Sequence, residues 1–374
     1  MPTTVTYDNP PAGISMSAAL KDENVLVSTK GYLSSEAGND FITHLEGIWG
    51  FFSGSLQPKG VLPSQVDHLL AVLKPKEALV YCNELQQRIQ MRSKRAIKAG
   101  EPVSKDDIAG IEELVFIDSE GTPIEVQPDE GVVLIMSVGW RKCLFYDLEV
   151  FGPEPKPRSL DLAKLFGRYH QHLLFQEMYS IRDDQWERMF EWGWFPFIWM
   201  TTDERKKVIH FSDRASEPKE LFEEICKRFK TIVDSRINSW NTKGAFQSHK
   251  AFIDTAVKHY EIGDYLSAIQ VLFPRIEGVM REIHLIKQPG QKAGQKSMVE
   301  ALVSEQSDYS LLLPNRFRDY LLNFYFRAFN QSVGDVPLSR NSVAHGASLP
   351  EDYDFVKASL GFMILDQMFY YQLP

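Results

Sequence analysis

Cysteine is scarce in this sequence, with 3 residues in a chain of 374. Cys82, Cys143 and Cys226 lie far apart, and no CxxC pair or Cys/His spacing typical of a zinc site occurs. An odd, sparse set of cysteines is typical of reduced thiols in the cytoplasm rather than of a secreted, disulfide-stabilised protein. We therefore expect a cytoplasmic protein without a metal site.

Long hydrophobic runs are also missing. The most apolar stretch, WGWFPFIWM at 192–200, is less than half as long as the roughly 20 residues that a membrane-spanning helix needs. The N-terminal sequence MPTTVTYDNPPAG lacks the basic and apolar regions of a secretory signal. We expect a soluble protein that neither crosses a membrane nor is secreted.

An excess of positive charge is absent as well, because the formal net charge is −9. The molecule as a whole is therefore not suited to bind nucleic acid by charge, and any contact with phosphates must be local. The best local basic stretch is KQPGQKAGQK at 287–296, in which Lys287, Lys292 and Lys296 are candidates for RNA contacts. The alternative is that this loop is merely solvated.

Several common catalytic motifs do not occur. The sequence has no P-loop, no GxGxxG after a strand, no GxSxG and no HExxH. His170 and His172 are two positions apart, so they point to different sides of a helix and do not form a pair of metal ligands. Nucleotide hydrolysis, serine-hydrolase and zinc-protease chemistry are therefore unsupported, and we expect no cofactor.

The residues that are present predict a folded, multi-domain, mainly α protein. Apolar residues make up 44% and charged residues 24%, as in ordinary soluble domains, and the length predicts two or three domains. Alternating periodicity predicts a small antiparallel β meander at about 114–151, and FGPEPKPRS at 151–159 resembles a connector. We expect a mixed α+β region at 1–155, a Trp-rich helical region at 156–245 and a helical bundle at 246–374.

The mixed region is expected to be mostly helical. Residues 1–35 are rich in Pro, Gly, Ser and Thr and predict a loose arm or an edge strand. Helical spacing predicts helices at 39–52 and at about 64–98, the second interrupted near Pro75. The aromatic cluster at 180–200 favours core packing, with a partner-binding or base-stacking surface as the alternative.

The C-terminal region has the clearest helical pattern. Ser248 can cap a helix that buries Phe252 and ends at Gly263. Asp264 can cap the next helix, which should bend at Pro274 because proline removes a backbone donor and clashes with the preceding turn. Shorter helices follow near 297–304 and 315–329.

The final helix is predicted over about 351–371. Ser348 and Glu351 form a capping-box pattern, and Pro350 stands in the first turn.

The stretch RNSVAHG, Arg340 to Gly346, stands between the last two predicted helices, directly after Ser339, a possible N-cap. Arginine at a helix N-terminus meets the positive end of the helix dipole, which is mildly unfavourable, so local helix stability does not require Arg340. Asn341 and His345 are four positions apart and share a helix face. The guanidinium, the amide and the imidazole can therefore converge on one small anionic group.

That combination of side chains suits cleavage of a phosphodiester. Imidazole exchanges protons near neutral pH, and guanidinium forms paired hydrogen bonds with phosphate oxygens. On RNA, His345 would act as general base for the 2′-hydroxyl or as acid for the leaving 5′-oxygen, and Arg340 would stabilise the phosphate in the transition state. The alternative is that an arginine and a histidine near a helix end have only a structural role.

RNSVAHG resembles the R-polar-x-x-x-H signature of HEPN domains, which are helical bundles of prokaryotic toxins, defence systems and CRISPR effectors. The upstream stretch GDYLSAIQVLFPRIEGVMREI, 263–283, is similar to the long second helix in a branch of that superfamily. The resemblance covers about 246–374, and residues 1–245 show no comparable match.

The resemblance implies a metal-independent endoribonuclease, a toxin or anti-phage effector, that is restrained by an antitoxin or awaits a trigger protein. It also implies a homodimer in which two domains bring their Arg and His residues to one cleft. Arg340, Asn341 and His345 match the motif, and Glu277 is the candidate for a supporting acidic residue on the earlier helix. The alternative for Glu277 is a salt bridge with Arg281, and the alternative for the protein is a non-catalytic dimerisation, nucleotide-binding or adaptor module.

Overall fold

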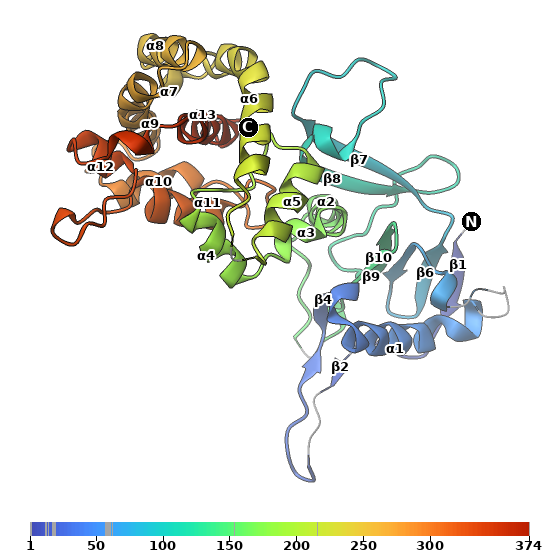
Figure 1. The fold of residues 1–374 in the computed structure, drawn as a ribbon. Coiled ribbons are helices and arrows are strands. Elements are labelled where there is room, and N and C mark those ends of the chain that lie inside the picture. The colour runs from blue at the N-terminus through green and yellow to red at the C-terminus, as the bar shows by residue number, and fades with distance from the viewer. Residues whose placement is uncertain are drawn as a thin grey trace. The chain divides into compact units, whose positions relative to one another are not determined.

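The computed structural model describes residues 2–373 apart from residues 12, 14, 17–19, 57–60, 62, 153 and 215. About 49% of the chain is helical and 16% is in strands, with an antiparallel sheet in the N-terminal part and helices in the C-terminal part (Figure 1). The chain forms two compact units, residues 1–92 with 110–179, and residues 93–109 with 180–374. The three-segment division expected from the sequence stays a prediction.

A six-stranded antiparallel sheet forms the centre of the first unit. In spatial order its strands are β1 (Thr3–Thr6), β6 (Glu77–Cys82), β5 (Leu69–Leu73), β9 (Gly131–Val138), β10 (Arg141–Asp147) and β4 (Lys30–Ser34). Two further pairs are β2 (Ser15–Met16) with β3 (Val27–Ser28), and β7 (Gln86–Ser93) with β8 (Ile108–Ile117).

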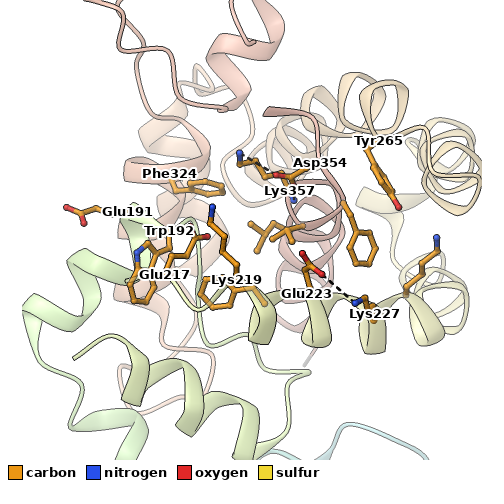
Figure 2. Close-up of a pocket in the computed structure, with 15 residues that line it drawn as sticks. Glu191, Trp192, Glu217, Lys219, Glu223, Lys227, Tyr265, Phe324, Asp354 and Lys357 are labelled. Carbon is orange, nitrogen blue, oxygen red and sulfur yellow. Dashed lines mark hydrogen bonds and ion pairs between the residues drawn. The ribbon is translucent and has the colours of Figure 1, made fainter. Parts of the chain in front are cut away.

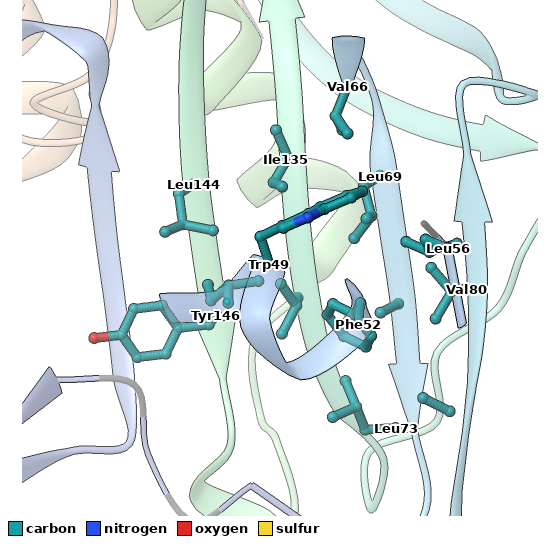
Figure 3. Packing of buried hydrophobic residues seen from close by; sticks show 14 of the residues in the cluster. Trp49, Phe52, Leu56, Val66, Leu69, Leu73, Val80, Ile135, Leu144 and Tyr146 are labelled. Carbon is teal, nitrogen blue, oxygen red and sulfur yellow. The ribbon is translucent and has the colours of Figure 1, made fainter. Parts of the chain in front are cut away.

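Helices cover both faces of this sheet. Trp49 and Phe52 of α1 (Asn39–Leu56) share one buried cluster with Leu69 and Leu73 of β5 (Figure 3). On the other face, α2 (Leu162–Leu174) packs into a second cluster that contains Leu70. Because successive side chains of a strand point to opposite faces, β5 is buried on both sides. The unit is therefore a sheet between two helical layers.

The helix predicted at 64–98 is wrong, because this stretch forms β5, β6 and β7. Strand β5 lies inside the sheet and its sequence LLAVL is buried at every position. A strand covered on both faces has no polar alternation, so periodicity cannot separate it from a buried helix. The first region is thus not mostly helical, although the helix predicted at 39–52 is confirmed as part of α1.

The meander predicted at 114–151 is correct only in part. Strands β9 and β10 form the expected antiparallel hairpin. Strand β8 pairs with β7, however, and the second neighbour of β9 is β5. The partner of a strand depends on segments that are distant in sequence, which local periodicity does not report. Strands β1 and β4 form the two edges of the sheet, in agreement with the edge strand expected within 1–35.

Burial lowers the pKa of His68, His170 and His172 in this unit. His170 of α2 is 9% exposed, and burial, followed by the nearby His68, lowers its pKa to about 4. In the unfolded chain the same imidazole takes up a proton near its ordinary pKa of about 6.5. Protonation therefore favours unfolding, so the stability contribution of neutral His170 is complete above about pH 6.5 and declines as the pH falls toward 4.

We expect the substitution His170→Gln to reduce the pH dependence of stability in this window. Between pH 6.5 and 4, the free energy of unfolding of the wild type should fall more steeply than that of the variant, by up to about 1.36 kcal/mol per pH unit. Urea denaturation at several pH values measures both slopes, with His44→Gln, at a less buried position of α1, as the control. Equal slopes for wild type and His170→Gln would contradict a buried neutral imidazole.

Helices make up most of the second unit (Figure 1). The first unit ends with the short helix α3 (Gln176–Tyr179). The second unit begins its helical part with α4 (Asp183–Glu191), α5 (Thr202–Phe211), α6 (Lys219–Trp240), α7 (Gly244–Gln247) and α8 (Lys250–Glu261). They are followed by α9 (Tyr265–Lys287), α10 (Gln295–Val303), α11 (Pro314–Tyr320), the π-helix η6 (Leu321–Tyr325), α12 (Arg340–Ala344) and α13 (Phe355–Tyr370).

Helix α13 is the core of this unit. All of its residues from Ala358 to Tyr370 are buried, and it packs against α6 and α9. One buried carboxylate lies among the apolar side chains: Asp366 accepts hydrogen bonds from Arg236 Nε at 2.7 Å and from Trp240 Nε1 at 2.9 Å. Burial raises the pKa of Asp366, and both donors come from α6. This polar contact therefore ties α6 to α13.

The aromatic cluster expected in the core is buried. Trp194, Phe195, Phe197 and Trp199 are all less than a tenth exposed. The core interpretation is confirmed for these four residues, whereas Trp192 of the same cluster is partly exposed.

Two predicted helix starts are wrong. Ser248 precedes α8 but does not cap it, because its hydroxyl donates to Glu282, and Phe252 is 45% exposed. The last helix begins at Phe355, where Asp354 accepts a hydrogen bond from the Lys357 amide, and the predicted capping box lies in a separate 3₁₀ turn. At the last helix, Asp354 provided an alternative cap close by in sequence, whereas no side chain caps α8.

The boundary between α8 and α9 agrees with the prediction. Gly263 has a φ of +83°, and the side chain of Asp264 accepts a hydrogen bond from the Ser267 amide. Helix α9 continues through Pro274. Across the described residues, no helix combines the length and the apolar character that a bilayer crossing requires.

Candidate active site around Arg340 and His345

A network of serine hydroxyls holds the start of α12. Ser339 is the N-cap, as predicted: its hydroxyl accepts from the Ser342 amide at 3.1 Å and donates to the Arg327 carbonyl at 2.8 Å. The Ser342 hydroxyl donates to the Pro337 carbonyl at 2.7 Å. Both serines are fully buried, so the backbone on which Arg340 stands is fixed.

Arg340 contacts the carboxylate that the sequence proposed as its support. Glu277 of α9 is 7% exposed, and its Oε2 forms an ion pair with Arg340 Nε. The other oxygen, Oε1, accepts from Arg281 Nη2 at 2.6 Å. Glu277 is therefore both the helix-face partner of Arg281 and a contact of Arg340. Two guanidinium groups share one carboxylate, which leaves a net charge of +1 on the group.

Asn341 joins three segments of the bundle. Its Nδ2 donates to the Phe326 carbonyl at 2.7 Å. Its Oδ1 accepts from Gln295 Nε2 at 3.0 Å and from Arg340 Nη1 at 3.3 Å. The amide is thus engaged at both ends, which makes Asn341 a positioning residue for Arg340 and for the start of α10.

His345 ends α12 and reaches solvent. Its backbone amide donates to the Asn341 carbonyl at 3.1 Å, and Gly346 follows with a φ of +65°. The imidazole is exposed and packs beside the Phe329 ring, with centroids 5.8 Å apart. Among the described residues, no hydrogen bond or ion pair engages the imidazole nitrogens. The imidazole is therefore available to a substrate.

Arg340 and His345 stand at opposite ends of α12, five residues apart. With a rise of about 1.5 Å per residue, the two positions are separated by roughly 7.5 Å along the helix axis. Both ends of α12 contact the segment 326–329. Asn341 donates a hydrogen bond to the Phe326 carbonyl, and the His345 ring packs beside the Phe329 ring.

The basic loop lies beside this site, but its lysines differ in availability. Lys287 is not free as expected, because it is 14% exposed and pairs with Glu305 at 3.2 Å. Lys296 is 78% exposed, and its ammonium lies 3.9 Å from the Glu300 carboxylate. Lys292 is exposed as well.

Two contacts attach this loop to the site. Arg281 Nη1 donates to the Ala293 carbonyl at 3.3 Å, and Gln295, where α10 begins, bonds Asn341. Lys292 is therefore the loop lysine best placed for a phosphate near Arg340.

Sequence reasoning missed two residues of this site. Gln295 contacts Asn341 and Phe329 contacts His345, although they lie 46 and 16 positions away in sequence. Gln295 lies in the basic stretch 287–296, but no sequence pattern pairs it with Asn341 or pairs Phe329 with His345, so only the tertiary structure reveals these contacts.

The three cysteines are free thiols, and burial raises the pKa of Cys143 and of Cys226 to about 12. In the part of the chain that the structure describes, no group of three or more His, Cys, Asp or Glu side chains has the geometry to hold a metal ion.

Comparison of the chain with models of protein families, with curated protein sequences and with solved structures finds no match.

Proposed function

We propose that this protein is a metal-independent endoribonuclease of the HEPN type, and that helices α8 to α13 form its HEPN-like bundle. The observation that supports the proposal best is the environment of the two motif residues. A buried carboxylate, Glu277, holds the guanidinium of Arg340, while the imidazole of His345 at the other end of α12 is exposed and engaged by no polar group in the described chain.

The proposed reaction is an internal transfer within RNA. His345 takes the proton of a 2′-hydroxyl, whose oxygen attacks the adjacent phosphorus, and the bond to the 5′-oxygen breaks as that oxygen takes a proton from water. The products are a 2′,3′-cyclic phosphate and a 5′-hydroxyl. Arg340 donates hydrogen bonds to the phosphate oxygens, where negative charge grows in the transition state. Glu277 and Asn341 act as positioning residues, since they contact Arg340 and not the substrate.

The charge around the site supports an RNA substrate held over a short length. The Glu277 group carries a net positive charge, and Lys292 adds a second cation in the loop that Arg281 and Gln295 attach to the site. The whole chain is acidic, with a net charge of −9, so long-range attraction of RNA is not part of the proposal. We propose a toxin or anti-phage effector that acts as a homodimer under the control of an antitoxin or a trigger.

The first test is cleavage of total RNA and transfer RNA by the full chain in EDTA, with the product ends identified. The expected result is fragments that end in cyclic phosphate. An equimolar mixture of His345→Ala and Arg340→Ala chains, refolded together, should regain part of the activity that each lacks alone, because a composite dimer site would combine intact residues from both chains. Cleavage that His345→Ala retains contradicts the proposal, and cleavage without regain in the mixture contradicts the composite site alone.

A second candidate function is a non-catalytic HEPN-like dimerisation or adaptor module. The contact that favours it is the ion pair of Arg340 with Glu277, which a structural arginine would also make. The two candidates differ in the effect of Arg340→Lys, which keeps the charge but loses the paired hydrogen bonds to phosphate. A loss of RNA cleavage without a loss of thermal stability supports the enzyme.

A further inference from the structure

A pocket of about 740 Å³ lies elsewhere in the second unit (Figure 2). It is lined by α6, by the start of α13, by Tyr265 of α9 and by two aromatic side chains, Trp192 and Phe324. Its volume falls within the roughly 300–1,000 Å³ that is typical of small-molecule sites. No residue of the Arg340 site lines it, so the pocket is a separate feature.

The aromatic wall of the pocket is held in place. Gly193 follows Trp192 with a φ of +76°, and a Cβ at Gly193 would lie 2.5 Å from the Phe324 ring. The Tyr320 hydroxyl donates to the Gly193 carbonyl at 2.9 Å, and its ring stacks on Phe324 with centroids 5.2 Å apart. Trp192 and Phe324 are both partly exposed. They therefore offer preformed flat faces on which a planar ring can stack.

Several charged groups of the pocket already have partners. Lys227 lies 3.5 Å from Glu223, and Lys357 lies 3.7 Å from Asp354. Lys230 Nζ donates to the backbone carbonyls at the end of α8. These lysines are compensated by the protein itself, so they contribute little free positive charge to a ligand.

Three charged groups at one end of the pocket remain unengaged. Within the described residues, no salt bridge or side-chain hydrogen bond involves Lys219, Glu217 or Glu191. Figure 2 shows Lys219 and Glu217 together with Trp192 and Phe324 at this end, and Tyr265 at the other. A ligand that fits this end should therefore have a planar ring to stack on the aromatic side chains. It should also have hydrogen-bond donors that face the Glu217 carboxylate and an anionic group that faces the Lys219 ammonium.

We infer that this pocket binds a guanine nucleotide, with the base on Trp192 and Phe324, its Watson–Crick edge on Glu217 and a phosphate on Lys219. Guanine presents two adjacent donors on that edge, N1–H and the 2-amino group, which match the two oxygens of a carboxylate. Adenine presents one donor and one acceptor there, so a carboxylate does not bind it in the same way.

The pocket and the Arg340 site share one short segment. Phe324 lines the pocket, the next residue, Tyr325, donates to the Phe273 carbonyl of α9, and the Phe326 carbonyl accepts from Asn341. Residues 321–325 form a π-helix, a rare element that frequently occurs at functional sites. The inference does not rest on the proposed ribonuclease activity, because the ligand contacts residues of the pocket alone.

The test is isothermal titration of GTP into the full-length protein, with ATP as the comparison ligand. GTP should bind at one site per chain and more tightly than ATP. Lys219→Ala and Trp192→Ala should each weaken GTP binding by about tenfold or more, because each removes one direct contact. Glu217→Gln should reduce the preference for GTP over ATP, since an amide offers a donor where guanine requires an acceptor.

Lys258→Ala is the matched control, because it removes an exposed lysine from α8 outside the pocket, and it should leave GTP binding unchanged. His345→Ala should also bind GTP as the wild type does, which separates this inference from the proposed nuclease activity. Circular dichroism checks that every variant is folded. Absence of GTP binding, or unchanged GTP affinity in Lys219→Ala and Trp192→Ala, overturns the site. Equal affinity for ATP and GTP overturns the assignment of guanine.

Discussion

The substitution His345→Ala is expected to abolish detectable RNA cleavage. A general acid or base contributes about 10²- to 10⁴-fold to the rate of such a reaction. The free energy of unfolding should change by less than about 0.5 kcal/mol, because the side chain is exposed and its contact is the edge of Phe329. Cleavage of transfer RNA in EDTA and thermal denaturation measure the two effects.

His210→Ala is the control for this experiment, since it removes an exposed imidazole from α5. It should cleave RNA at the wild-type rate. A parallel loss of activity and stability in His345→Ala would show that His345 has a structural role, and undiminished cleavage would remove it from the mechanism.

The substitution Glu277→Gln is expected to affect both stability and activity. The amide cannot neutralise Arg281 and Arg340, which then repel each other beside a buried site. Breaking a fully buried ion pair costs about 3–5 kcal/mol, and because both arginines reach solvent we expect about 1–2 kcal/mol here. Activity should fall by about tenfold to a hundredfold, because Arg340 would no longer be held in one position.

The control is Glu300→Gln on α10, which removes an exposed carboxylate that lies 3.9 Å from Lys296. It should change the free energy of unfolding by less than about 0.5 kcal/mol and leave cleavage unchanged. The cleavage rate is measured well below the melting temperature of the variant. A wild-type rate at that temperature would show that Glu277 stabilises the bundle without orienting Arg340.

The proposed guanine nucleotide site connects to the candidate active site through residues 324–326. Phe324 lies in one site and the Phe326 carbonyl holds Asn341 in the other. A change at Phe324 on ligand binding would therefore reach Asn341 within two residues.

The sequence predicted local features well where one residue decided the structure. Gly263 adopts a positive φ that only glycine takes without strain, and Asp264 and Ser339 cap their helices with hydroxyl or carboxylate oxygens. The prediction failed at Ser248, because a hydroxyl that can cap a helix can equally bond a carboxylate of another helix, here Glu282. Local pattern does not distinguish these two partners.

The sequence by itself determined the β hairpin at 131–147, the motif RNSVAHG and its N-cap, since each depends on residues close together in the chain. Only the tertiary structure decided that LLAVL is a central strand, that Asn341 meets Gln295 and Phe326, and that Trp192 and Phe324 form one wall of a pocket. These features depend on what covers a segment. Coverage is set by packing between residues far apart in the chain, which no periodicity records.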